Sequence, residues 1–215
     1  MSKASTKFGL AVAAVILAAA GAGVGLGVTY RENDARAVFL PDRVMTVLPQ
    51  PQTLTPFTLH DHAGQPFDLA RLHGKWSLVF FGFSSCHDVC PSTLATLAQL
   101  RGELARDGAV EQVQLVFVSV DPGRDDAATL KRYVGAFDAG LLGVTGVDTQ
   151  IRRLADQLGA AYQVSAGTGS KHYPVIHSPA LYLLDPQARY HAVLTPPFDA
   201  KVIGARFRDL RRLER

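Results

Sequence analysis

Two long apolar runs constrain the fold of this chain more than any other feature. Trp76–Phe83 (WSLVFFGF) and Val113–Val120 (VQLVFVSV) contain no charged residue, and such runs are typical of strands that are covered on both faces. Between them, Pro91–Arg106 has leucines at positions 94, 97, 100 and 104, a helical period with the proline suited to the first turn. Strands that alternate with helices in this way predict an α/β domain.

Short hairpins flank this alternation on both sides. Pro56–Leu69 (PFTLHDHAGQPFDL) indicates two short strands around a turn at Asp61–Gly64, and Ala180–Leu184 is followed by Tyr190–Leu194 across another turn. The strands of a hairpin run antiparallel. We therefore expect one α/β domain, residues 54–215, with a mixed central sheet.

The N-terminus carries an apolar segment of its own. Residues 8–28 (FGLAVAAVILAAAGAGVGLGV) are 21 residues without a charge, and about 20 apolar residues suffice for a helix to span a bilayer. Lys3 and Lys7 precede the segment, so the positive-inside rule places residues 1–7 in the cytoplasm. We expect a single-pass anchor in a bacterial inner membrane, a proline-containing linker over residues 29–53, and the domain in the periplasm. A cleaved signal peptide is the alternative, because small residues within the segment resemble a cleavage site.

The charge of the chain gives no sign of a nucleic-acid partner. The net charge is +3, and the one dense group of arginines is Arg206–Arg215. Those charges are spaced around Phe207, Leu210 and Leu213, as on an amphipathic terminal helix. We expect a solvated helix face there, and no nucleic acid as a partner.

The chain has only two cysteines, Cys86 and Cys90, at the predicted junction between the first apolar strand and the helix that follows it. Residues four apart on a helix or turn lie on one face, with Cβ atoms roughly 5–6 Å apart, which is wider than the ~3.8 Å across a typical disulfide. A disulfide closing so short a loop would add little stability. The helix N-terminus is expected to lower the thiol pKa, which favours nucleophilic attack and metal binding alike. The pair is therefore interpreted as functional, either as a redox couple or as two arms of a metal site.

A metal site would need at least one further ligand. Two thiolates are soft ligands that suit Cu(I), whereas structural zinc usually takes four ligands. Among the seven histidines, His177 stands out because it precedes a predicted strand and follows a polar, glycine-rich loop. His60 and His62 fall in a polar turn, and His191 is expected at the surface. Sequence spacing leaves open whether His177 meets the cysteines.

Four segments in this order resemble the Sco/SenC family, membrane-anchored copper-binding proteins with a thioredoxin fold. The segments are Phe81-Gly82-Phe83 with Cys86, Cys90-Pro91 and Thr93-Leu94; Val118–Pro122 with Arg124-Asp125; Leu130–Tyr133 with Phe137 and Gly143–Gly146; and His177-Ser178 with Tyr182–Pro186. A Cys-x-x-x-Cys pair alone is a weak signal, but four ordered segments together are specific. The resemblance implies a thioredoxin-like fold and a role in assembling the binuclear copper centre of cytochrome c oxidase.

Carried over position by position, the resemblance implies that Cys86, Cys90 and His177 bind copper, as Cu(I) with Cu(II) as a further candidate. It also implies that Asp121 is an acid close to the ligands, although a turn-forming role before Pro122 is an equal alternative. The implied partners are the copper-bearing subunit of cytochrome c oxidase and other periplasmic copper chaperones or thiol reductants.

The chain departs from the family pattern at two positions beside the implied ligands. His87 follows the first cysteine where the family commonly has proline, and Ile176 precedes the ligand histidine where the family commonly has aspartate. His87 could coordinate Cu(II), lower the cysteine pKa or point into solvent, and we favour solvent. The missing acid removes one group that could orient His177.

Three functions compete at this stage. Copper delivery uses Cys86, Cys90 and His177 together. A thiol–disulfide oxidoreductase would use Cys86 to attack and Cys90 to resolve, without needing His177. A redox or copper sensor acting through a partner is the third.

Overall fold

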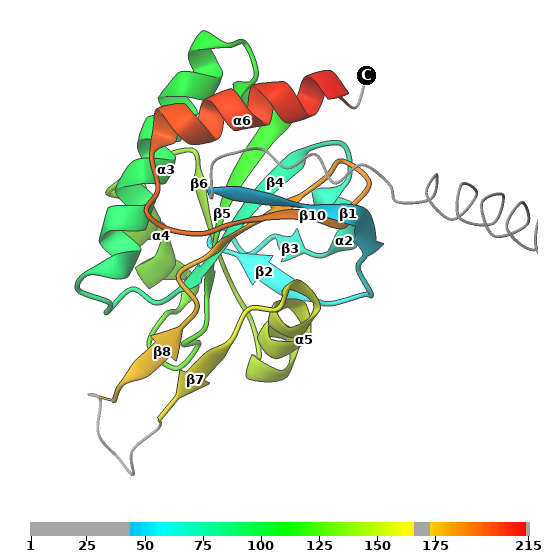
Figure 1. The fold of residues 1–215 in the computed structure, drawn as a ribbon. Helices are drawn as coiled ribbons and strands as arrows, with labels where there is room; N and C mark the ends of the chain where they lie inside the picture. The colour runs from blue at the N-terminus through cyan, green and yellow to red at the C-terminus, as the bar shows by residue number, and fades with distance from the viewer. Residues whose placement is uncertain (1–43, 166–172, 214–215) are drawn as a thin grey trace, which may run out of the picture. The chain divides into compact units, whose positions relative to one another are not determined.

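The computed structural model describes residues 44–165 and 173–213, which form a mixed sheet between helices (Figure 1). The strands are β1 (Met45–Thr53), β2 (Leu59–Asp61), β3 (Pro66–Phe67), β4 (Trp76–Gly82), β5 (Val113–Ser119), β6 (Leu141–Thr145), β7 (Tyr162–Val164), β8 (Val175–His177), β9 (Leu181–Leu184) and β10 (Arg189–Leu194). The helices are α2 (Leu69–Leu72), α3 (Val89–Arg106), α4 (Ala127–Gly135), α5 (Asp148–Leu158) and α6 (Ala200–Leu213), with a 3-10 turn η1 (Val110–Gln112).

The main sheet contains parallel and antiparallel strands in the order β1-β10-β9-β4-β5-β6-β2-β3. At its centre β4, β5 and β6 run parallel to one another, and β9 pairs antiparallel with β4. The two predicted hairpins are present as β2–β3 and β9–β10. The expected α/β fold with a mixed central sheet is therefore confirmed.

Strand β4 is covered on both faces, as its continuous apolar sequence predicts. All seven of its residues are buried. Leu78 and Phe80 join one core, and Val79 and Phe81 join the other, because successive side chains of a strand point to opposite faces. The end of β4 is thereby fixed on both sides, and the cysteine loop begins there.

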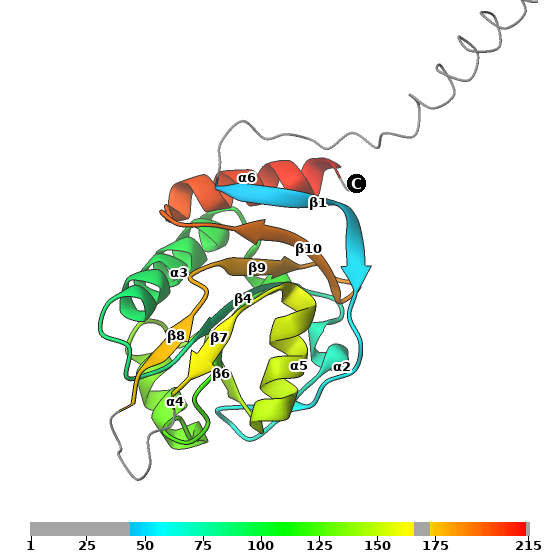
Figure 2. The same cartoon turned by 60° about the horizontal axis from the view of Figure 1, so that its bottom comes forward.

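The helices form one layer on each face of the sheet (Figures 1 and 2). Helices α3, α4 and α6 line the first core, and α2 and α5 line the second. The four predicted leucines of α3 are all buried. Pro91 lies in the first turn of α3, where its missing N–H leaves no helical hydrogen bond unmade.

The prediction of a linker over residues 29–53 is wrong for the last part of that range. Met45–Thr53 is the edge strand β1, which pairs antiparallel with β10, and Met45 is buried in the first core. The pairing is irregular between Val47 and Gln52, the stretch that contains Pro49 and Pro51. Prolines cannot donate to a ladder and are tolerated on an irregular edge strand, so their presence did not exclude a strand.

The expected cytoplasmic segment 1–7 and anchor 8–28 lie outside the described residues. Within residues 44–165 and 173–213, no helix has the length and apolar character needed to cross a membrane.

Candidate metal centre

The cysteines lie where β4 ends and α3 begins. Cys86 is half-buried in the connecting loop, where its backbone N–H donates to Phe83 O over 3.2 Å. Cys90 is fully buried in the first turn of α3. Both cysteines are free thiols. One cysteine is therefore partly exposed while the other is enclosed by protein.

His177 reaches this loop from a separate hairpin. It ends β8, which pairs with β7 and places Tyr162 directly across from His177. The imidazole is held between two aromatic rings, edge-on to Phe80 at 5.7 Å and to Phe83 at 5.9 Å between ring centroids. Because both rings belong to the segment that leads into the cysteine loop, their packing sets the distance between histidine and thiols.

The hydrogen bonds of His177 determine which nitrogen faces the thiols. Nδ1 lies 3.1 Å from the carbonyl oxygen of Ser178, and Nε2 lies 3.3 Å from Cys90 Sγ. A carbonyl can only accept, so Nδ1 carries the proton and the lone pair of Nε2 points at the sulfur. Burial lowers the pKa of His177 and favours the neutral imidazole. This is the protonation state that binds a metal.

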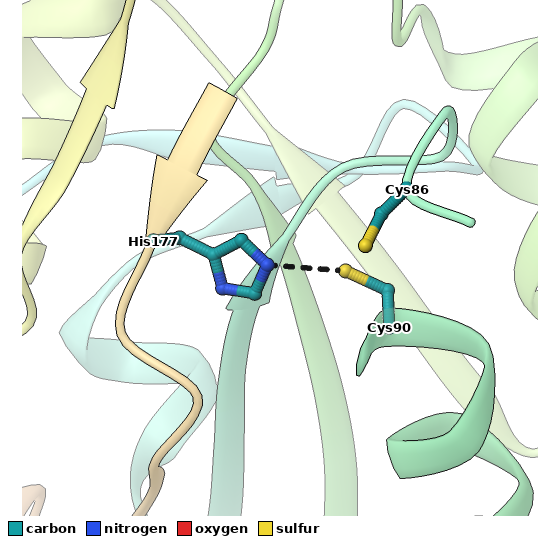
Figure 3. A group of neighbouring side chains, drawn as sticks. All are labelled: Cys86, Cys90 and His177. Atoms are coloured by element: carbon teal, nitrogen blue, oxygen red, sulfur yellow. Dashed lines mark hydrogen bonds between the residues drawn. The ribbon is translucent and has the colours of Figure 1, made fainter. Parts of the chain in front are cut away.

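The three side chains meet at one point (Figure 3). One donor atom each from Cys86, Cys90 and His177 lies within 4.8 Å of the others. No comparable cluster of His, Cys, Asp or Glu occurs elsewhere in residues 44–165 and 173–213. The structure thus brings together all three side chains singled out from the sequence, and two sulfurs with one imidazole form a donor set suited to Cu(I).

The expectation of a lowered thiol pKa is wrong for Cys90. Burial raises the pKa of the Cys90 thiol well above its usual range, and a hydrogen bond with Cys86 acts in the same direction. Desolvation of a thiolate in the core outweighs the favourable field of the helix N-terminus. Cys90 is therefore a thiol in the absence of metal, and it can donate its proton toward His177 Nε2.

His87 and Asp121 lie outside the cluster of donor atoms. His87 is exposed, in keeping with the interpretation that it points into solvent. Asp121 is 1% exposed, and its carboxylate accepts hydrogen bonds from Arg124 Nε and from Tyr173 Oη, the latter at 2.5 Å. Its backbone carbonyl also closes a turn with Arg124 N–H at 3.1 Å. Asp121 therefore combines a turn with a buried ion pair, and a direct influence on a metal stays a prediction.

Sequence reasoning missed three residues next to the site. Arg124 and Asp125 belong to a segment quoted for the family resemblance, but we assigned them no role. Tyr173 lies at the end of the polar loop. The signal was an Arg-Asp pair that follows closely on a buried strand, because ligands bind outside the carboxyl ends of the strands in an α/β sheet.

Comparisons with known proteins agree with this geometry. The family model described as SCO1/SenC matches residues 46–211. The mouse mitochondrial protein SCO2 homolog is 40% identical over 134 residues, 62% of this chain and 52% of that protein, so the match spans about half of the mouse protein. An SCO2-like protein of Rickettsia prowazekii is 32% identical over 155 residues, 72% of this chain and 75% of that protein.

A solved structure described as Arabidopsis thaliana ScoI with copper bound has the same fold. It superposes with a TM-score of 0.67 at 30% identity, over 74% of this chain and 98% of that one. The mixed α/β fold of this chain thus matches the thioredoxin-like fold of solved Sco structures. Fold, family match and sequence identity agree, and the chain belongs to the SCO1/SenC family.

Proposed function

We propose that this chain binds Cu(I) through Cys86, Cys90 and His177 and delivers it to the binuclear copper centre of cytochrome c oxidase. The observation that carries the proposal is the convergence of two sulfurs and one imidazole nitrogen within 4.8 Å. The solved Arabidopsis relative described with copper bound supports the choice of metal. The family resemblance supports the oxidase as the destination.

The environment of the three donors suits both uptake and release. Both cysteines must lose their protons when copper binds, so binding releases protons. Cys90 is enclosed, and His177 is half-buried but packed against two rings, so both provide a fixed base for the ion. Cys86 is half-buried in a loop. A partner's ligand can approach on the Cys86 side and displace the protein's ligands one at a time.

The same proposal includes attachment to a membrane. The uncharged segment 8–28 supports a single-pass anchor in a bacterial inner membrane with the domain in the periplasm, close to a membrane-bound oxidase. Other periplasmic copper chaperones or thiol reductants would load the site or keep its thiols reduced. Protease protection of the C-terminal domain in intact spheroplasts would contradict this orientation.

Copper titration of the reduced full chain in detergent tests the binding step. We expect Cys86→Ser, Cys90→Ser and His177→Ala to lower Cu(I) affinity by more than about 100-fold, beyond the 10–100-fold typical of losing a residue that only supports a ligand. His87→Ala is the matched control and should retain wild-type affinity, because His87 is exposed and outside the cluster. Mixing the loaded chain with the copper-free soluble domain of the oxidase subunit tests delivery, and copper that stays on the donor would contradict it.

A thiol–disulfide oxidoreductase is the second candidate, because the two free sulfurs lie within 4.8 Å of each other. A disulfide would draw them to about 2.05 Å and abolish the copper site. The protein therefore cannot bind copper and hold the disulfide at the same time. Thiol exchange that is unchanged in His177→Ala, together with unchanged copper affinity, would favour this candidate over delivery.

A further inference from the structure

The hairpin that carries His177 is not part of the main sheet. Strands β7 and β8 form a two-stranded sheet of their own, visible below the main sheet in Figure 1. At the base of the hairpin, Ser178 N–H donates to Ala161 O at 2.8 Å, and Ala161 N–H donates to Ser178 Oγ at 3.0 Å. These bonds hold one end of β8. The position of His177 also depends on what holds the other end.

At that other end, Tyr173 is held by a buried ion pair. Tyr173 Oη donates to Asp121 Oδ1 at 2.5 Å, and Arg124 Nη1 donates to the Tyr173 carbonyl at 3.3 Å. Arg124 Cζ lies 3.9 Å from the centroid of the Tyr173 ring, within the range of a cation–π contact. Arg124 Nε in turn donates to Asp121. One guanidinium thus contacts the ring, the backbone and the acid partner of the same tyrosine.

The same guanidinium also packs against a ring that contacts His177. Arg124 Cζ lies 5.6 Å from the centroid of Phe83, the ring that packs edge-on against His177. The next residue, Asp125, holds the start of the cysteine loop, because its carboxylate accepts from Ser84 N–H at 2.9 Å and from the Ser84 hydroxyl. Adjacent residues of one turn therefore hold the histidine hairpin and the cysteine loop.

We propose that Arg124, together with Asp121 and Tyr173, is a positioning clamp that holds His177 against the two thiols. The clamp touches neither sulfur nor the imidazole directly. It acts by fixing the far end of β8 and by packing behind Phe83. The effect of the clamp on copper binding rests on the proposed function. Its effect on the hairpin does not depend on copper.

A double-mutant cycle on the full chain tests the effect on copper. Arg124→Gln removes the charge and the stacking plane, and it should weaken Cu(I) binding by about tenfold, the effect expected of a group that supports a ligand. In the His177→Ala background the same substitution should change affinity by less than about twofold, because its effect is transmitted through His177. Arg132→Gln, an exposed arginine on α4, is the matched control and should be neutral in both backgrounds. An equal loss in both backgrounds would overturn the coupling.

Amide hydrogen exchange in the reduced, copper-free chain tests the clamp without metal. Arg124→Gln and Tyr173→Phe should each accelerate exchange in β8 by about tenfold relative to β9, because a hydrogen bond to a charged group is lost. Tyr173→Phe removes a single hydroxyl and keeps the ring, so it preserves the fold. Unchanged exchange in β8 would overturn the clamp. If the wild-type chain does not bind copper, the proposed function fails while the exchange result still decides the clamp.

Discussion

Gly82 packs closely against Cys90. Replacing it with alanine should damage both the fold and the metal site. A Cβ atom at this position would stand 2.7 Å from Cys90 Sγ and 2.7 Å from Phe117 Cε2. Both distances are about 0.7 Å short of the closest ordinary contact of 3.4 Å. Cys90 and Phe117 are fully buried, so neither side chain can withdraw into solvent.

The size of both effects follows from this geometry. Adding a methyl group to a packed core costs about 1–3 kcal/mol, so Gly82→Ala should lower the free energy of unfolding by that amount. Metal–ligand distances tolerate only about 0.2 Å, and a sulfur displaced by about 0.7 Å exceeds that tolerance. We therefore expect Cu(I) affinity to fall by at least about tenfold, a cost of about 1.4 kcal/mol.

Urea unfolding of the copper-free chain and Cu(I) competition measure the two effects separately. Gly102→Ala is the matched control, because Gly102 is exposed on α3 and an added Cβ meets nothing within 4 Å. It should stabilise the chain by about 0.5–1 kcal/mol, since alanine is the better helix former, and leave copper affinity unchanged. If Gly82→Ala retains wild-type stability and affinity, the close packing of Gly82 against Cys90 is refuted.

Two further predictions concern the scaffold. A chain that begins at residue 54 should be at least about 2 kcal/mol less stable than one that begins at residue 44, because it lacks β1 and the buried Met45; equal urea midpoints would mean that β1 is dispensable. Asp125→Ala should lower the free energy of unfolding by about 1–3 kcal/mol, because it deprives Ser84 N–H and the Ser119 hydroxyl of their acceptor. Thermal unfolding measures this loss beside the control Asp156→Ala, which replaces an exposed acid. Equal losses in both variants would contradict the prediction.

Local patterns were sufficient to predict the framework around the site. The run that became β4 has the apolar character of a strand buried on both faces, and the leucine period that became α3 has the spacing of a helix with one buried side. These signals depend on residues close together in the chain. They placed both cysteines correctly at the junction between strand and helix.

The third side chain of the site could not be derived from spacing. His177 lies 87 residues after Cys90, and only the family resemblance connected the two. The contact is made by a separate hairpin, by aromatic packing and by the Arg124–Tyr173 contact. All of these are long-range, and none leaves a periodic signal in the sequence.

Two errors have the same physical origin, tertiary contacts that override a local preference. His191 was expected at the surface, but it is 4% exposed and lies edge-on to Trp76 with ring centroids 5.3 Å apart. Cys90 was expected to have a lowered pKa because it begins a helix, but its burial raises the pKa. In both cases the depth of burial is set by elements distant in sequence, here the packing of β10 and of the helix layer.

X-ray absorption spectroscopy of the Cu(I)-loaded full chain tests the central claim most directly, because it counts the atoms bound to copper. We predict two sulfur ligands and one nitrogen ligand per copper, with the nitrogen contribution lost in His177→Ala and retained in His87→Ala. A first coordination sphere of sulfur alone in the wild-type chain, or a nitrogen contribution that survives in His177→Ala, would contradict the three-ligand site.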